Sequence, residues 1–223
     1  MQKRTVRIGD YITAEYGWTL TKWELSAPEQ KTTYVEKTGG DGSWDLSTVL
    51  TGGLPRYKDR KLTATFECSE GTREDREELI NSMVNQLDGL EWKIVPPDRP
   101  EHYLVGRVHV AVNQNSLSWA MVTVTATVSP WLYSEKTTIN ELSTNSSATQ
   151  SVELVNKGRL AVVPVLTATA GSKIVLQFGD ISSTLTGGGT YEWAGMLLTP
   201  GKHILRYSGS GTFRISYREA VLR

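Results

Sequence analysis

The side chains that could bind a metal or act as a nucleophile are scattered along the sequence. His102, His109 and His203 are the three histidines, and none has a second histidine, a cysteine or a carboxylate at the spacing of metal ligands. Cys68 is the single cysteine, so the chain cannot form an internal disulfide. Because Cys68 ends an apolar strand pattern, we predict a small buried side chain rather than a reactive thiol.

The carboxylates do not form a recognisable site either. Asp41 and Asp45 flank a glycine turn, but the further acidic ligands and the closing glutamate of a calcium loop are absent. Asp180 and Glu192 are the only pair in the C-terminal part that could serve a glycoside hydrolase, and their context does not support that role. The glycine run 187–189 is followed by neither lysine nor a helix start, so it is not a phosphate loop. We therefore predict no catalytic residue, no metal site, no cofactor and no enzymatic activity.

Aromatic side chains are the remaining candidates for ligand binding. The seven tryptophans could stack on sugars, pack at subunit interfaces or fill a β-sandwich core. Trp193, which lies between Tyr191 and Gly195, is the best placed of them to stack on a sugar. We favour core or subunit packing for Trp193, whereas the sugar-binding alternative predicts a shallow exposed groove with Trp193 or Tyr191 in it.

The element expected to organise the N-terminal part is a single helix that follows a strand. Residues 60–67 alternate apolar and polar side chains, as in a half-buried strand. Thr72 then provides an N-cap, Asp75 stands at the capping-box position, and Gly89 can end the helix in a left-handed conformation. The apolar side chains on one helical face are Leu79, Ile80, Met83, Val84 and Leu87.

Strands are expected on both sides of this helix. Residues 103–112 and 119–128 are apolar and β-branched, and the turn-prone stretch 113–116 between them indicates a hairpin. Before the helix, residues 27–36 form a polar extended segment, typical of an edge strand or of an arm that lies on another surface. The sequence therefore predicts one helix across a sheet as the centre of an N-terminal domain, residues 1–133.

The C-terminal part has a different composition. Residues 134–150 are rich in serine, threonine and asparagine, which predicts a linker or a solvent-facing crossover. Residues 151–223 contain short strand patterns with a turn signal about every ten residues, which indicates a β-sandwich domain. The whole chain is therefore predicted to be mainly β, with two domains.

The composition argues against several kinds of partner. The 223 residues carry a formal net charge of zero, so nothing favours an electrostatic grip on nucleic acid or on a membrane surface. No apolar run approaches the ~20 residues that span a bilayer, and the N-terminus lacks the apolar core of a signal peptide. We expect a protein that is made and folded in a cytoplasm.

The order and spacing of several short stretches resemble the N-terminal domain of the distal tail proteins of long-tailed (siphovirus-type) bacteriophages. The resemblance covers most of residues 10–133, and it includes the predicted helix. The stretches that carry it are APEQK (27–31), GGDGSWDLS (39–47), YKDRKL (57–62), YLVGRV (103–108), TVTA (123–126) and SPW (129–131). Ser129 departs from the family, whose members often have cysteine or aspartate before this proline. Residues 199–203 and 217–219 carry a match to the family's second domain.

The resemblance implies a β-sandwich or split-barrel-like N-terminal domain and a galectin-like or carbohydrate-module-like C-terminal β-sandwich. It implies a structural virion protein that forms a hexameric ring at the tail tip, joins the tail tube to the baseplate or host-adsorption apparatus, and lets DNA pass through a neutral or acidic bore. The implied partners are further copies of the chain (also as back-to-back rings), the tail tube protein, the tail-tip hub or tail-associated lysin, a receptor-binding protein and, in some phages, host surface glycans. A carbohydrate-binding adhesin that acts in host-surface recognition is the alternative function.

Overall fold

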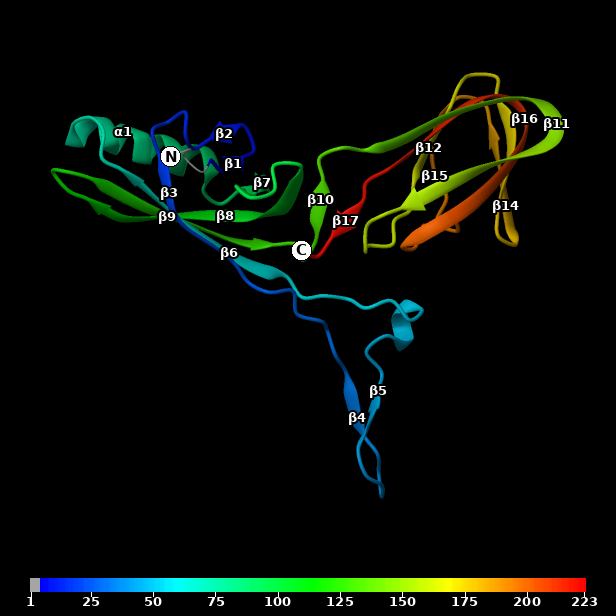
Figure 1. The fold of residues 1–223 in the computed structure, drawn as a ribbon, viewed down its shortest axis with the longest axis horizontal. Coiled ribbons are helices and arrows are strands. Elements are labelled where there is room, and N and C mark those ends of the chain that lie inside the picture. The colour runs from blue at the N-terminus through cyan, green and yellow to red at the C-terminus, as the bar shows by residue number, and fades with distance from the viewer. Residues whose placement is uncertain (1–4) are drawn as a thin grey trace. The chain divides into compact units, whose positions relative to one another are not determined.

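The computed structural model describes residues 5–223 and divides the chain into two compact units, Met1–Pro130 and Trp131–Arg223. Strands dominate both units, and the described residues contain a single α-helix, which lies in the first unit (Figure 1). The prediction of a mainly β chain with one helix is therefore confirmed.

The first unit is built on one antiparallel sheet. Seven strands of this sheet lie in the first unit. In spatial order, they are β2 (Tyr11–Ile12), β1 (Arg7–Ile8), β7 (Glu91–Val95), β8 (His102–Asn115), β9 (Ala120–Val128), β6 (Arg60–Cys68) and β3 (Thr19–Leu25). The hairpin expected over residues 103–128 is the β8–β9 pair, in which Val110 lies opposite Val124. Apolar side chains alternate with polar ones along β6 and β9, so the sheet has one buried face and one open face.

Helix α1 (Arg73–Leu87) packs against the buried face and begins as predicted (Figure 1). The Asp75 N–H donates to Thr72 Oγ1 at 3.1 Å, and the Thr72 N–H donates to Asp75 Oδ2 at 2.8 Å. The bond from the Thr72 backbone lowers the pKa of Asp75, so this cap stabilises the helix at neutral pH and weakens as the pH falls through that lowered pKa. Gly89, with φ 75°, follows the helix end in the left-handed conformation that the sequence predicts.

The capping box gives a direct test of helix stability. We expect Thr72→Ala to lower the free energy of unfolding by about 1 kcal/mol, because the Asp75 N–H loses its acceptor. Urea denaturation followed by circular dichroism measures this loss. Ser82→Ala is the matched control, because the Ser82 hydroxyl only accepts from the exposed Gln86 side chain at 2.8 Å, and its loss should stay within about 0.5 kcal/mol. Equal losses in both variants would show that the capping box does not stabilise α1.

A buried arginine joins the helix to the tip of the β8–β9 hairpin, and no pattern in the sequence predicted this contact. Arg76 is 1% exposed. Its guanidinium donates to Gly71 O at 2.7 Å and to Ser116 O and Leu117 O, each at 2.9 Å. Because these carbonyls belong to two separate turns, Arg76 fixes the position of the hairpin tip relative to α1.

A long two-stranded arm leaves the sheet between β3 and β6 (Figure 1). It comprises residues 27–58 and contains β4 (Tyr34–Glu36), β5 (Ser43–Asp45) and the 3-10 turn η1 (Val49–Thr51). At its base, the Lys31 N–H donates to Arg56 O and the Lys58 N–H donates to Glu29 O, both at 2.8 Å. The polar extended segment 27–36 is therefore part of an arm rather than an edge strand of the main sheet.

The second unit is one hydrogen-bonded sheet folded over on itself. Its strands are β11 (Thr138–Asn156), β12 (Val165–Ala168), β13 (Lys173–Phe178), β14 (Ile181–Thr186), β15 (Gly189–Glu192) and β16 (Gly201–Tyr217). The first half of β16 pairs with β13, the second half pairs with β12, and β11 follows the other edge of β16 along both halves. The short strands β10 (Leu132–Ser134) and β17 (Ala220–Val221) also pair with each other.

The two halves of this folded sheet enclose one core, as in a β-sandwich. Ile174 and Leu176 come from β13, Leu166 comes from β12, and the long strand β16 supplies Leu205 to one half and Phe213 to the other. All five side chains are buried in the same cluster. The β-sandwich predicted for the C-terminal part is therefore confirmed.

The linker predicted over residues 134–150 is wrong from Thr138 onward. Residues 138–156 form β11, which pairs with β16 from Thr138 opposite Tyr217 to Asn156 opposite Gly201. The polar composition reflects a strand whose outer side chains face solvent, and β16 satisfies its backbone groups. Along the chain, the division between the two compact units falls between residues 130 and 131, a few residues before the predicted domain boundary.

Candidate functional site

The residues that could have formed a catalytic or metal site lie in separate environments. The Nδ1 atom of His109 lies 2.8 Å from Asp88 Oδ1, and His203 Nε2 lies 2.7 Å from Thr199 O. His102 Nδ1 lies 4.0 Å from Glu101 Oε1. Within residues 5–223, no group of three His, Cys, Asp or Glu side chains is placed to hold a metal ion.

The other candidates from the sequence have local structural roles. Cys68 is buried, as predicted. The Ser47 N–H donates to Asp45 Oδ1 at 2.9 Å, and hydrogen bonds from Ser47 lower the pKa of Asp45. This carboxylate therefore orders the chain where it leaves β5. Asp180 lies in the turn between β13 and β14, whereas Glu192 ends β15 on the far side of β16 and β12.

The two aromatic side chains that the sugar-binding alternative places in a shallow groove, Trp193 and Tyr191, both pack on a hydrophobic core. Trp193 is partly buried against the core of the second unit. Tyr191 also packs on this core, and its hydroxyl donates to Thr186 O at 2.9 Å. The packing interpretation favoured for Trp193 is therefore confirmed.

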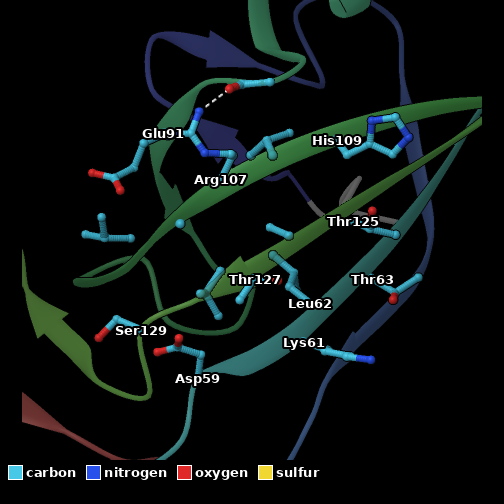
Figure 2. A pocket seen from close by; sticks show the side chains of 16 residues that line it. Asp59, Lys61, Leu62, Thr63, Glu91, Arg107, His109, Thr125, Thr127 and Ser129 are labelled. Atoms are coloured by element: carbon cyan, nitrogen blue, oxygen red, sulfur yellow. Dashed lines mark hydrogen bonds between the residues drawn. The ribbon is translucent and has the colours of Figure 1, made fainter.

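The open face of the first sheet carries a groove. A cavity of about 950 Å³ lies over β6, β9 and β8 (Figure 2). Threonines from β6 and β9 cover much of this face because their positions alternate with the buried ones. These threonines are Thr63, Thr65, Thr123, Thr125 and Thr127.

Charged side chains of both signs surround the threonines. Lys61 and Arg107 lie on either side of Thr127 in the sheet, and Asp59 and Glu91 also line the groove (Figure 2). Arg107 is held by a hydrogen bond to a backbone carbonyl, Gly89 O. Two cations beside two carboxylates give the groove little net charge, so it offers hydroxyl groups rather than a strong site for anions.

One end of the groove is fixed by a carboxylate at the end of α1. Asp88 Oδ1 accepts from the Val110 N–H at 2.8 Å and contacts His109. The hydrogen bond from the Val110 N–H is the largest cause that lowers the pKa of Asp88, and the contact with His109 lowers this pKa further. Asp88 therefore stays ionised near neutral pH and holds the helix end against β8.

The sheet of the first unit also has unpaired edges, two of which belong to its long strands. Strand β3 ends the sheet on one side, and its outer edge has no strand partner among the described residues. On the other side, β7 pairs with β8 only from Leu104 to Arg107. Beyond Val110, the outer edge of β8 has no partner strand in the described part of the chain. Unpaired edges of this kind accept strands from other chains.

The arm exposes large apolar side chains on β4 and β5 and around η1. Trp44 is 61% exposed and Leu50 is 98% exposed. The other members of this apolar patch are Tyr34, Val35, Leu46 and Val49. The arm has no core of its own, and a two-stranded ribbon is marginally stable alone. An apolar patch on such a ribbon marks a surface that another molecule covers.

The comparisons with known proteins bear on the fold. No family model and no curated protein sequence matches the chain. Among solved structures, the chain is similar to the crystal structure of the Dit protein of phage SPP1, described as a paradigm of the hub adsorption apparatus in phages that infect Gram-positive bacteria. The two share 14% sequence identity with a TM-score of 0.70, over 96% of this chain and 98% of the other. The chain therefore has the Dit fold across both units, as the resemblance in the sequence led us to expect. Within residues 5–223, no helix has the length and hydropathy that crossing a membrane requires.

Proposed function

We propose that this chain is a distal tail protein of a long-tailed phage or prophage, and that six copies form a ring at the tail tip. The observation that carries the proposal is the likeness to SPP1 Dit over both units. The ring joins the tail tube to the baseplate or host-adsorption apparatus, and it acts as a structural protein without enzymatic activity.

The two unpaired edges support a ring. In a rotational ring, one patch of each copy meets a different patch of the next copy. The outer edge of β3 and the free part of β8 are two such patches at opposite sides of one sheet. Pairing between them would join the sheets of successive copies into a closed wall, in which both of these edges are paired.

The size of such a wall suits a DNA conduit. Each copy contributes the four neighbouring strands β8, β9, β6 and β3. At about 4.8 Å per strand, six copies give a wall about 37 Å across, which leaves about 27 Å once side chains about 5 Å long line it. The threonine-rich face lines the bore in this arrangement. Its mixed charges fit the neutral one of the two expected kinds of bore, neutral or acidic, because a conduit must not bind phosphates tightly.

The arm supports assembly in a second way. It leaves the unit beside β3, so a neighbour that pairs with β3 lies within reach of the arm. We propose that the apolar patch of the arm packs on that neighbouring copy, and that the second unit serves the tail-tip hub and the receptor-binding protein.

Light scattering over a concentration series tests the ring. We expect a particle of six chains of 24.7 kDa each, or twice that for back-to-back rings. The tail tube protein of the same phage is added in a parallel series, because a ring can need a template to close. A chain that stays monomeric in both series would contradict the proposal.

A further inference from the structure

The second unit has one long edge strand, β11. The strands at the two ends of the sheet order, β14 and β15, have only six and four residues. In contrast, β11 has 19 residues and pairs only with β16, so its outer edge has no strand partner among the described residues. Natural sheets keep their edge strands short, because an unpaired edge accepts strands from other chains. The length of β11 departs from that rule.

The first half of β11, residues 138–146, is the more open half. A register shift between Ser146 and Gln150 interrupts the pairing of β11 with β16. In the second half, Val155 O already accepts from the Tyr217 hydroxyl at 2.9 Å. Within residues 5–223, no segment other than β16 forms backbone hydrogen bonds with residues 138–146. These nine residues leave an edge about 30 Å long to be paired.

The usual protections of an edge strand are missing from this half. Natural edges carry lysine, proline or unpaired charges that keep other strands away. Residues 138–146 contain no lysine, arginine or proline. Their one charged side chain, Glu141, is paired with Arg214 of β16, with 2.6 Å between Oε1 and Nη2. This ion pair has no net charge, so it does not repel an incoming strand.

The core of the second unit is incomplete along the same edge. Leu142 packs against the core but is only partly buried, whereas Phe213, which lies opposite it on β16, is 1% exposed. A further strand beside β11 would cover Leu142, and an apolar side chain opposite Leu142 would extend the core. The next positions on this face of β11 are polar, Asn140 and Thr144. The edge therefore favours a strand with one or two apolar side chains at its centre.

We propose that the outer edge of residues 138–146 binds an extended segment of a different protein by strand addition. Main-chain hydrogen bonds along the edge supply most of the affinity in this mode of binding. The side chains of the segment that face the core supply specificity, because one of them must cover Leu142. The alternate side chains lie beside Glu141 and Ser143 on the solvent face, where polar residues fit.

A second copy of this chain fits the edge less well. The same edge of two copies can face each other only across a two-fold axis, whereas the copies within one six-fold ring are related by rotation about the ring axis. Strands β14 and β15 of a neighbouring copy are too short to cover nine residues. The choice of a different protein therefore rests on the proposed ring, but the ability of β11 to accept a strand does not.

A synthetic peptide with the sequence GSGTFRISY, residues 209–217 of this chain, is the probe. In β16 this sequence already pairs with residues 138–146, with Phe213 opposite Leu142 and Arg214 opposite Glu141. We expect the labelled peptide to bind the full chain saturably in fluorescence anisotropy. Hydrogen exchange with mass spectrometry should show slower exchange in residues 138–146 and no change in residues 150–156.

A modified peptide tests whether the backbone makes the contact. N-methyl groups on the two residues that correspond to Phe213 and Arg214 leave every side chain in place. Consecutive N–H groups of a strand point to opposite sides, so one of the two blocked groups faces β11. This peptide should bind at least tenfold more weakly. Because it leaves the protein unchanged, the comparison does not depend on the folding of any variant.

Leu142→Lys tests the place of binding on the protein. An inward-pointing charge at the edge keeps a further strand away, so this variant should bind the peptide at least fivefold more weakly. Val152→Lys is the matched control, because Val152 is a partly buried core-facing residue in the second half of β11, and its binding should not change. Thermal unfolding checks that the second unit is intact in both variants.

Three outcomes would overturn the proposal. They are no saturable binding, equal binding of the N-methylated peptide, and slower exchange outside residues 138–146. Light scattering on the same samples tests the occupant, since dimers that Leu142→Lys abolishes would identify a second copy and contradict the choice of a different protein. A chain that binds the peptide as a monomer supports strand addition and contradicts only the ring.

Discussion

The double substitution Trp44→Ser, Leu50→Ser in the arm should convert a hexameric ring into monomers while the folded units stay intact. Both side chains are largely exposed in the single chain, so their removal costs the monomer little. If they pack on a neighbouring copy, their loss removes about 4 kcal/mol from each interface, which corresponds to about a thousandfold weaker association. Light scattering over the concentration series measures the shift.

The control for this prediction lies on the same hairpin. Glu36→Ser changes an exposed polar side chain of β4, and the particle mass should not change. Equal thermal unfolding of all three proteins shows that the units are intact. If the double variant assembles at the same concentrations as the parent protein, the arm does not form the contact that closes the ring.

The second large effect is expected at Gly209, near the end of the half of β16 that pairs with β13. Gly209 has φ 115°, and a Cβ there would lie 2.1 Å from the backbone oxygen of Lys173. Because Lys173 is held in β13, this oxygen has no room to move away. We expect Gly209→Ala to cost at least about 4 kcal/mol and to unfold the second unit, since it adds a backbone clash to the strain of a positive φ. Urea unfolding and limited proteolysis measure the loss.

A second glycine of the same strand separates the clash from the backbone strain. Gly201 has φ 116°, nearly the value of Gly209, but a Cβ there would meet nothing within 4 Å. Gly201→Ala should therefore cost only about 1–2 kcal/mol, the strain of the left-handed region alone. Losses of similar size in the two variants would show that β16 can shift at Gly209 without breaking its pairing with β13.

The elements that the sequence predicted well are those with a strong local signal. The start of α1 was recognisable because Thr72 and Asp75 satisfy each other's backbone groups within one turn of chain. The β8–β9 hairpin was recognisable because two alternating runs flank a short polar turn. The burial of Cys68 follows from the same alternation along β6.

The candidate site was predicted only in part. The segment 27–36 was recognised as an arm or edge strand because it has too little apolar surface to pack on both faces. Its partner strand and the exposed apolar patch around Trp44 and Leu50 were not recognised. The apolar residues of 44–50 look like core residues in the sequence, and only their distance from any core in the structure makes them a surface. Trp193 shows the reverse, since this candidate ligand platform is partly buried against the core of the second unit.

The sequence by itself determined the mainly β class, the single helix and the hairpin that follows the helix in the chain. It also showed that no recognisable catalytic motif is present. These features depend on side-chain periods and turns within a few residues. Only the tertiary structure decided that residues 138–156 are a strand, that the threonines of β6 and β9 share one open face, and that β11 lies at an edge of its sheet. Each of these depends on pairing between residues far apart in the chain. The composition of a segment does not encode such a partner, because backbone hydrogen bonds across a sheet can satisfy a polar stretch as well as water can.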